Sequence, residues 1–276
     1  MKKLSKPNQP NQKWAGKKTG KFSLGMFSLV ICFLYMPLII LVVYSFNESR
    51  MMNWGGFSLR WYEELFFSSG SLWQSFGNSA MIAVTSATVS TLIGTLGAIG
   101  LYWYNFRFRK AIQLTAFLPM LIPEIIIGVS LLIFFAGLKF QLSLFTIFLA
   151  HTTFNIPFVL LVVMARLEEF DFTIIEAAYD LGAREFQALL KVILPTAFPG
   201  IMSGFLIAVT LSLEDFVITF FVSGPGSSTL PLHIYSMIRF GVSPVINALS
   251  VIVIAGTVVL AVLSRNVVKL VFQQNR

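Results

Sequence analysis

Six long apolar stretches divide this chain, and they constrain its fold more than any other feature. Spanning the hydrocarbon core of a membrane as a helix takes about 20 mostly apolar residues. In lipid a helix satisfies its own backbone polar groups, and the alternating pattern of a barrel strand is absent here. The sequence therefore predicts an all-α membrane protein with six transmembrane helices. The stretches cover residues 22–46, 77–104, 111–138, 143–165, 199–222 and 246–264.

The composition excludes an ordinary soluble domain. Only 12% of the residues are charged and 56% are hydrophobic, whereas a soluble globular domain has about 25% charged residues. The mean hydropathy is +0.80. A multi-pass membrane protein embedded in a lipid bilayer is the class that fits.

The positive charges orient the predicted helices. Of the 20 Lys and Arg residues, 16 fall before the first stretch, after the second, after the fourth and after the sixth. The positive-inside rule then places both termini in the cytoplasm. We expect a basic cytoplasmic tail at 1–21, a six-helix transmembrane domain at 22–265 and a cytoplasmic tail at 266–276. Because topology explains the net charge of +8, no nucleic-acid partner is expected.

The longest cytoplasmic connection, residues 166–198, has the pattern of a helical hairpin. Thr173 and Glu176 have the spacing of a capping box, which predicts the start of a short helix. Gly182 suits the left-handed position that follows a helix. A second amphipathic helix follows, and we expect Pro195 to stop it. The pattern alone leaves open whether this hairpin lies on the lipid surface or binds a partner.

The spacing of this loop resembles the EAA loop of permease subunits in binding-protein-dependent ABC importers. Glu176, Ala177, Ala178, Gly182, Leu194 and Pro195 carry the resemblance, and Val192 stands where the family usually has isoleucine. The likeness extends over about residues 35–265 and is greatest to the polyamine subgroup, the spermidine and putrescine permeases. It also rests on the stretches "YSFNES", "GFSLRWYEEL", "RLEEFD", "LSLEDFVITFFVSGPG", "LPLHIYSMIRFGVSP" and "INALS".

The resemblance implies the type I ABC importer permease fold and an ATP-driven import function in the cytoplasmic (inner) membrane. In that family the EAA loop forms coupling helices in a groove of the cytoplasmic ATPase, so Glu176, Ala177 and Gly182 would be the docking surface and turn. The implied partners are a related, non-identical permease, two ATPase subunits and an extracytoplasmic polyamine-binding protein. The sequence has no G-x-x-x-x-G-K-[ST] element. We therefore expect ATP and Mg²⁺ on the ATPase and no cofactor on this chain.

Three acidic residues lie inside the apolar stretches, namely Glu124, Glu214 and Asp215. Each charge costs about 3 kcal/mol on membrane insertion scales, so an offset is needed. At about 1.5 Å per residue, Glu124 and Glu214 lie roughly 20 Å and 22 Å from the cytoplasmic starts of their helices. No Lys or Arg falls at that depth. A cationic passenger would neutralise the acids, and a linear polyamine matches several acids best.

Each of these acids also has a structural interpretation. Glu124 follows Pro123, with Pro119 one turn earlier, and could be an acid in the first turn of a restarted helix. Such a break would free backbone carbonyls to line a cavity. Glu214 and Asp215 point about 100° apart on a helix, so one of them is expected to face a pathway, and Asp215 is favoured.

Other functions remain open at this point. An importer for ferric iron or an oxyanion, a membrane-embedded enzyme, or a scaffold without a substrate path would share the apolar pattern. No catalytic residues and no metal site are expected, because His151 and His233 lie far apart and have no cluster of ligands around them. Both histidines are interpreted as structural or hydrogen-bonded. Small residues in "SATVSTLIGTLGAIG" predict close helix packing, either within the bundle or against a second permease.

Overall fold

The computed structural model describes residues 21–50, 53–169, 171, 173–240 and 244–274. In this part of the chain the regular elements are all helices, and they form two compact units, residues 1–66 with 243–276 and residues 67–242. The predicted N-terminal tail at 1–21 lies almost entirely outside the described residues. The prediction of an all-α fold is confirmed.

The first unit contains α1 (Lys21–Tyr44), α2 (Arg60–Phe67) and α12 (Pro244–Gln274). A loop between α1 and α2 folds back on itself around Asn47, which makes an antiparallel bridge with Phe57. The indole Nε1 of the fully buried Trp61 donates a hydrogen bond of 2.5 Å to the Asn47 carbonyl. The stretches "YSFNES" and "GFSLRWYEEL" therefore form one substructure.

The second unit is built on three long helices that pack against one another, α3 (Gly70–Trp103), α6 (Leu144–Glu168) and α9 (Leu194–Glu214). Small side chains allow their close approach. A Cβ on Gly94 would lie 2.8 Å from Val159 Cγ1, and one on Gly200 would lie 2.6 Å from Arg166 Cβ. The small-residue face of α3 thus packs within this unit, with Ser86, Ala87, Ser90, Gly94 and Ala98 buried.

The third predicted span is broken, as its prolines indicated. It forms α4 (Arg109–Leu121) and α5 (Glu124–Gly137), whose axes meet at 106° across Ile122 and Pro123. Ile122 is extended, and Pro123 occupies the N-cap of α5. α5 packs against α10 (Val217–Val222), and α4 packs against α6.

The fifth predicted span was wrong as one continuous helix to residue 222. α9 ends at Glu214, Asp215 adopts extended backbone angles, and α10 begins afresh at Val217. α11 (Leu230–Phe240) follows. The reason is local, because the Asp215 carboxylate binds the free backbone N–H groups of the next helix and so favours a new start.

The prediction of six spans is not settled by the described residues. Four of their helices are long and apolar enough to cross a membrane, and α4 with α5 makes a fifth if the bent pair is one span. The sixth predicted span lies in α12, whose apolar described part, Pro244–Val259, is shorter. The helix itself continues past residue 265 to Gln274.

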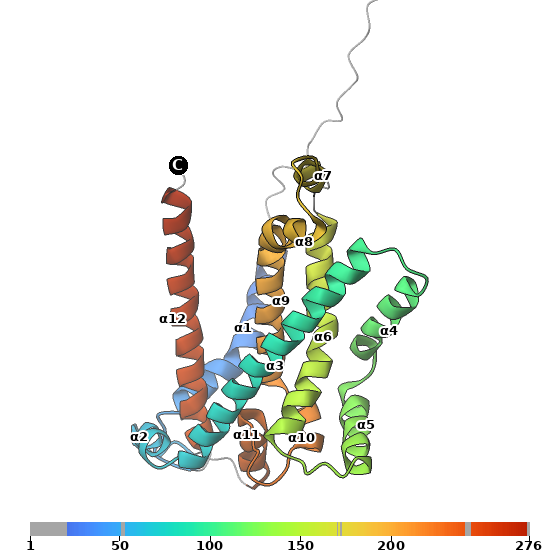
Figure 1. Cartoon of the computed structure of the whole chain (residues 1–276). Helices are drawn as coiled ribbons and strands as arrows, with labels where there is room; N and C mark the ends of the chain where they lie inside the picture. Colours follow the sequence, from blue (N-terminus) through green and yellow to red (C-terminus); the bar gives the residue numbers. More distant parts are fainter. Residues whose placement is uncertain (1–20, 51–52, 170, 172, 241–243, 275–276) are drawn as a thin grey trace, which may run out of the picture. The chain divides into compact units, whose positions relative to one another are not determined.

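The cytoplasmic hairpin of the prediction consists of α7 (Thr173–Asp180), α8 (Glu185–Ala188) and a π-helical turn, η1 (Leu189–Ile193). These elements lie at one end of α6 and α9, and α5, α10 and α11 lie at the other end (Figure 1). α8, η1 and α9 follow one another without a loop, from Glu185 to Glu214.

Candidate functional site

The three predicted acids line one cavity. It has a volume of about 300 Å³ and is bounded by α5, α6, α9 and the start of α10. We call it the acid cavity. Its lining residues are Glu124, Phe154, Leu211, Glu214, Asp215, Phe216 and Val217.

Helix breaks place all three acids at the cavity. Glu124 is the first residue of α5, directly after the α4–α5 break, so it is the first-turn acid that the sequence allowed. Glu214 is the last residue of α9, and Asp215 lies in the break that follows. Glu124 and Glu214 are exposed and take part in no ion pair within the described part of the chain. Their carboxylates are open to the cavity.

Asp215 differs from the other two acids because the protein itself occupies its carboxylate. Its side chain is only 5% exposed. Oδ1 accepts the backbone N–H of Ile218 at 3.2 Å. Oδ2 accepts the backbone N–H and the hydroxyl of Thr219, both at 2.8 Å. Asp215, directly before the N-cap residue Phe216, therefore satisfies free backbone N–H groups in the first turn of α10.

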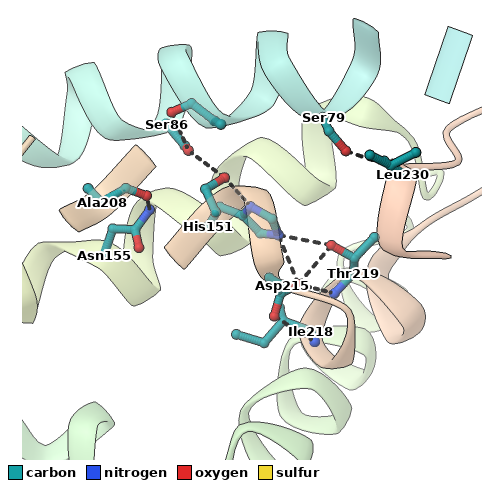
Figure 2. A network of polar contacts seen from close by, with 11 residues as sticks. Ser79, Ser86, His151, Asn155, Ala208, Asp215, Ile218, Thr219 and Leu230 are labelled. Carbon is teal, nitrogen blue, oxygen red and sulfur yellow. Dashed lines mark hydrogen bonds and ion pairs between the residues drawn. The ribbon is translucent and has the colours of Figure 1, made fainter. Parts of the chain in front are cut away.

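His151 completes the shell around Asp215 (Figure 2). This α6 side chain is 2% exposed, and its Nε2 lies 3.1 Å from Asp215 Oδ2 and 2.9 Å from Thr219 Oγ1. On the other side of the ring, Nδ1 lies 2.6 Å from Ser212 Oγ, which accepts a hydrogen bond of 3.3 Å from Ser86 of α3. One buried imidazole thus joins α3, α6, α9 and α10.

Donor and acceptor counting assigns the protons. The carboxylate of Asp215 only accepts, and the Thr219 hydroxyl already donates to it, so Nε2 of His151 must carry a hydrogen. In the neutral ring Nδ1 then accepts from the Ser212 hydroxyl. This assignment follows from the network of partners.

The sequence pattern gave His151 as structural or hydrogen-bonded, which the structure confirms, but it did not give its partners. The sequence does contain a pattern that could have indicated these partners. Ser212, Asp215 and Thr219 recur at i, i+3 and i+7, the spacing of one helix face, opposite a histidine in an apolar stretch. Within the described residues, no group of three or more His, Cys, Asp or Glu side chains could hold a metal ion.

At the other end of α9, the α7 helix presents the predicted docking residues. Glu176 and Ala177 are exposed and Ala178 is half-buried. Ile175 is buried and anchors the helix to the bundle.

A left-handed glycine ends α7 as predicted. Gly182 has φ +82°, its N–H binds the Tyr179 carbonyl at 2.9 Å, and the Ala183 N–H binds the Ala178 carbonyl at 3.0 Å. These bonds form a Schellman motif. The short turn lets the chain reverse direction between α7 and α8.

The predicted capping box of α7 was wrong. Thr173 is the first helical residue, and the carboxylate of Asp171 accepts its backbone N–H at 3.0 Å. This hydrogen bond lowers the pKa of Asp171. The T-x-x-E spacing was present, but a better acceptor stands two residues earlier.

Pro195 does not stop the second helix of the hairpin, so that prediction was also wrong. The chain passes through η1, where the Leu194 N–H binds the Leu189 carbonyl five residues back, and continues as α9 with Pro195 in its first turn. A proline lacks the N–H that an α-helix would need, but the first turn of a new helix does not use it. Leu194 is half-buried and Pro195 exposed.

A second contact ties the hairpin to the bundle. The Tyr104 hydroxyl, just beyond α3, donates a hydrogen bond of 2.5 Å to Glu185 Oε1 at the start of α8. Both residues line a hollow of about 340 Å³, together with Tyr179 and Phe186. The bond to the carboxylate raises the pKa of Tyr104, so its hydroxyl keeps its proton at neutral pH.

Comparison with known proteins gives consistent matches. Residues 90–274 match the family described as "Binding-protein-dependent transport system inner membrane component". The chain is 43% identical over 242 residues to the spermidine/putrescine transport system permease protein PotC of Escherichia coli K12, covering 87% of this chain and 91% of that protein. It is 42% identical over 233 residues to the putrescine transport system permease protein PotI of the same organism. The match covers 80% of this chain and 82% of that protein.

Solved structures agree on the fold. A bacterial ABC transporter involved in import of the acidic polysaccharide alginate has a chain with a TM-score of 0.69 at 16% identity, covering 95% of this chain and 99% of that one. A chain of the MetNI methionine ABC transporter gives a TM-score of 0.55 at 20% identity. The match covers 72% of this chain and 93% of that one. The expected permease fold is thereby confirmed.

Proposed function

Because the chain belongs to the binding-protein-dependent transport system inner membrane component family, we propose that it is the permease subunit of an ATP-driven polyamine importer. It is a multi-pass membrane protein, and we place it in the cytoplasmic membrane. Its passengers are putrescine or spermidine, the amines that the names of the similar permeases print.

The observation that carries the substrate class is the pair of open carboxylates in the acid cavity. Glu124 and Glu214 face the same volume of about 300 Å³ without a basic partner among its lining residues. A passenger with ammonium groups neutralises them and accounts for acids in a membrane span. Charge-assisted hydrogen bonds to ammonium groups are strong and directional. Phe154 and Phe216 supply an apolar wall for the methylene carbons.

The α7–α8 hairpin is the site where an ATPase docks. Exposed Glu176 and Ala177 permit close approach and one ion pair with a basic groove residue. Ala178, Gly182, Leu194 and Pro195 shape the turn and the exit into α9. ATP and Mg²⁺ bind on the ATPase, and this chain holds no cofactor.

The complete importer contains two ATPase subunits, a second permease that is related but not identical, and an extracytoplasmic binding protein that delivers the amine. α9 connects the docking end with the cavity, since it begins beside the hairpin and ends at Glu214. Closure of the ATPase pair on ATP displaces the hairpin, and α9 carries that motion to the acids. The cavity then changes its access from the outer to the cytoplasmic side.

An uptake competition tests this proposal. Cells that produce the chain with its partners are given a labelled diamine in the presence of unlabelled putrescine, spermidine, ferric iron or sulfate. The two amines should compete and the inorganic ions should not. Transport of iron or sulfate in preference to both amines would exclude the polyamine function, and peptide cleavage by the chain without an ATPase would favour a membrane enzyme.

A further inference from the structure

His151 has no part in the transport mechanism described above, although it is among the most deeply buried polar side chains of the second unit. A membrane protein gains no stability from an isolated buried imidazole, because its nitrogens need partners. Here both nitrogens have partners. Ser212 lies at Nδ1, and Asp215 with Thr219 lies at Nε2 (Figure 2).

The contacts divide the three acids of the cavity into two kinds. Oδ2 of Asp215 is surrounded by the Thr219 N–H, the Thr219 hydroxyl and the His151 Nε2–H. Three donors leave Oδ2 no capacity for an ammonium group, and Oδ1 already accepts the Ile218 N–H, so Asp215 offers a passenger less than either glutamate does. From the described residues, Glu124 and Glu214 accept no hydrogen bond of this kind, and both are exposed to the same cavity.

We propose that His151 is a positioning residue for substrate selection: it holds the Asp215 carboxylate against the first turn of α10, so that the cavity has two fully open carboxylates and one that is mostly occupied by the protein. This inference rests on the proposed function and deepens it. Two carboxylates match two ammonium groups, whereas a third free carboxylate would favour a triamine. The relative affinity for a diamine and a triamine is therefore set by a side chain that does not touch the passenger.

Four substitutions distinguish the positioning of Asp215 by His151 from a role of His151 in side-chain packing alone. His151→Leu fills the space but removes the donor to Asp215. His151→Gln keeps one amide N–H for Asp215 and one carbonyl for the Ser212 hydroxyl. Thr219→Val removes a second donor to Oδ2 and leaves the imidazole in place. His233→Gln, at the other histidine, is the matched control.

The experiment measures KM for putrescine and for spermidine in the complete importer, together with amide hydrogen exchange of residues 216–222. His151→Leu should lower the KM of spermidine relative to putrescine by about tenfold, the factor of one hydrogen bond to a charged group. It should also speed exchange in α10. Thr219→Val should change the KM ratio and the exchange rate in the same directions as His151→Leu. His151→Gln and His233→Gln should resemble the wild type.

Each outcome bears on one claim. If His151→Leu and Thr219→Val leave the KM ratio unchanged, the selection role is wrong. If exchange in α10 is also unchanged, Asp215 does not depend on His151 at all. If His151→Leu does not accumulate in the membrane, Thr219→Val alone decides. A wild-type importer that takes up neither amine overturns the proposed function, and the exchange measurement still tests the positioning of Asp215.

Discussion

The hydroxyl of Tyr104 and the carboxylate of Glu185 form a hydrogen bond of 2.5 Å that joins the end of α3 to the start of α8. The two residues are 81 positions apart in the sequence. This bond and the packing of Ile175 hold the hairpin to the bundle, so a force applied at the hairpin reaches α3 as well as α9.

Removing this bond should slow transport without removing the protein from the membrane. Tyr104→Phe removes the donor and Glu185→Ala removes the acceptor, and each should lower the uptake rate at saturating amine while the KM stays the same, because the acid cavity is unchanged. Tyr35→Phe, on the exposed face of α1, is the control. A raised KM with an unchanged maximal rate would contradict a coupling role.

The same bond predicts a pH dependence. The pKa of Tyr104 is raised, so the contact is fully present below the ordinary tyrosine pKa and is lost as pH rises through the raised value. The difference in rate between the wild type and Tyr104→Phe should therefore be constant across the neutral range. Uptake in proteoliposomes at several buffered pH values checks this, and a difference that vanishes near neutral pH would show that another group titrates.

Neutralising the open acids should weaken substrate binding. Glu124→Gln and Glu214→Gln should each raise the KM for putrescine by about tenfold, since a hydrogen bond to a charged group contributes about 1.5–3 kcal/mol. Glu63→Gln, an exposed acid on α2, should leave the KM unchanged. A double variant Glu124→Gln, Glu214→Gln with normal uptake would mean that the passenger does not use this cavity.

Close helix packing should make Gly94 intolerant of a side chain. Gly94→Ala places a Cβ within 2.8 Å of Val159 and should destabilise the protein by about 1–3 kcal/mol, the usual effect of overpacking. Gly100→Ala is the matched control on the same helix, because nothing lies within 4 Å of its added Cβ. Thermal unfolding in detergent measures both, and Val159→Ala should not restore the stability of the Gly94→Ala chain, because the Cβ of residue 159 would still lie 2.9 Å from the added Cβ.

The turn between α7 and α8 should tolerate only residues that accept a left-handed backbone. Gly182→Ala is strained at φ +82° by about 1–2 kcal/mol, whereas Gly182→Asn is strained less. We expect Gly182→Ala to reduce ATPase stimulation by the loaded binding protein, and Gly182→Asn to reduce it less. Gly70→Ala, which has open space around it, is the control. Equal stimulation in all three variants would show that the turn is not part of the docking surface.

The sequence was sufficient for features that depend on local pattern. The apolar stretches, the break at Pro123 and the left-handed Gly182 follow from helix length, a missing N–H and a missing Cβ. The gathering of Glu124, Glu214 and Asp215 also followed, because equal depth in two neighbouring spans depends only on the rise per residue.

What the sequence did not predict depends on contacts between distant residues. Asp215 was favoured as the acid facing a pathway, but its carboxylate is held by Thr219 and by His151, which lies 64 positions away. The π-helical turn at Leu189–Ile193 has no distinctive amino-acid composition, so the sequence predicts a helix stop at Pro195 that the structure does not have. Neither feature could be inferred before the packing of α6 against α9 was known.

The direct continuation from hairpin to cavity also affects how this chain can evolve. α9 has 21 residues and a length of about 30 Å, so a tilt of about 5° at Leu194 displaces Glu214 by roughly 2.6 Å. That displacement is comparable to the length of a hydrogen bond. A substitution in the hairpin that tilts α9 would therefore also move a carboxylate of the acid cavity, and we expect residues at the two ends of α9 to change together during evolution.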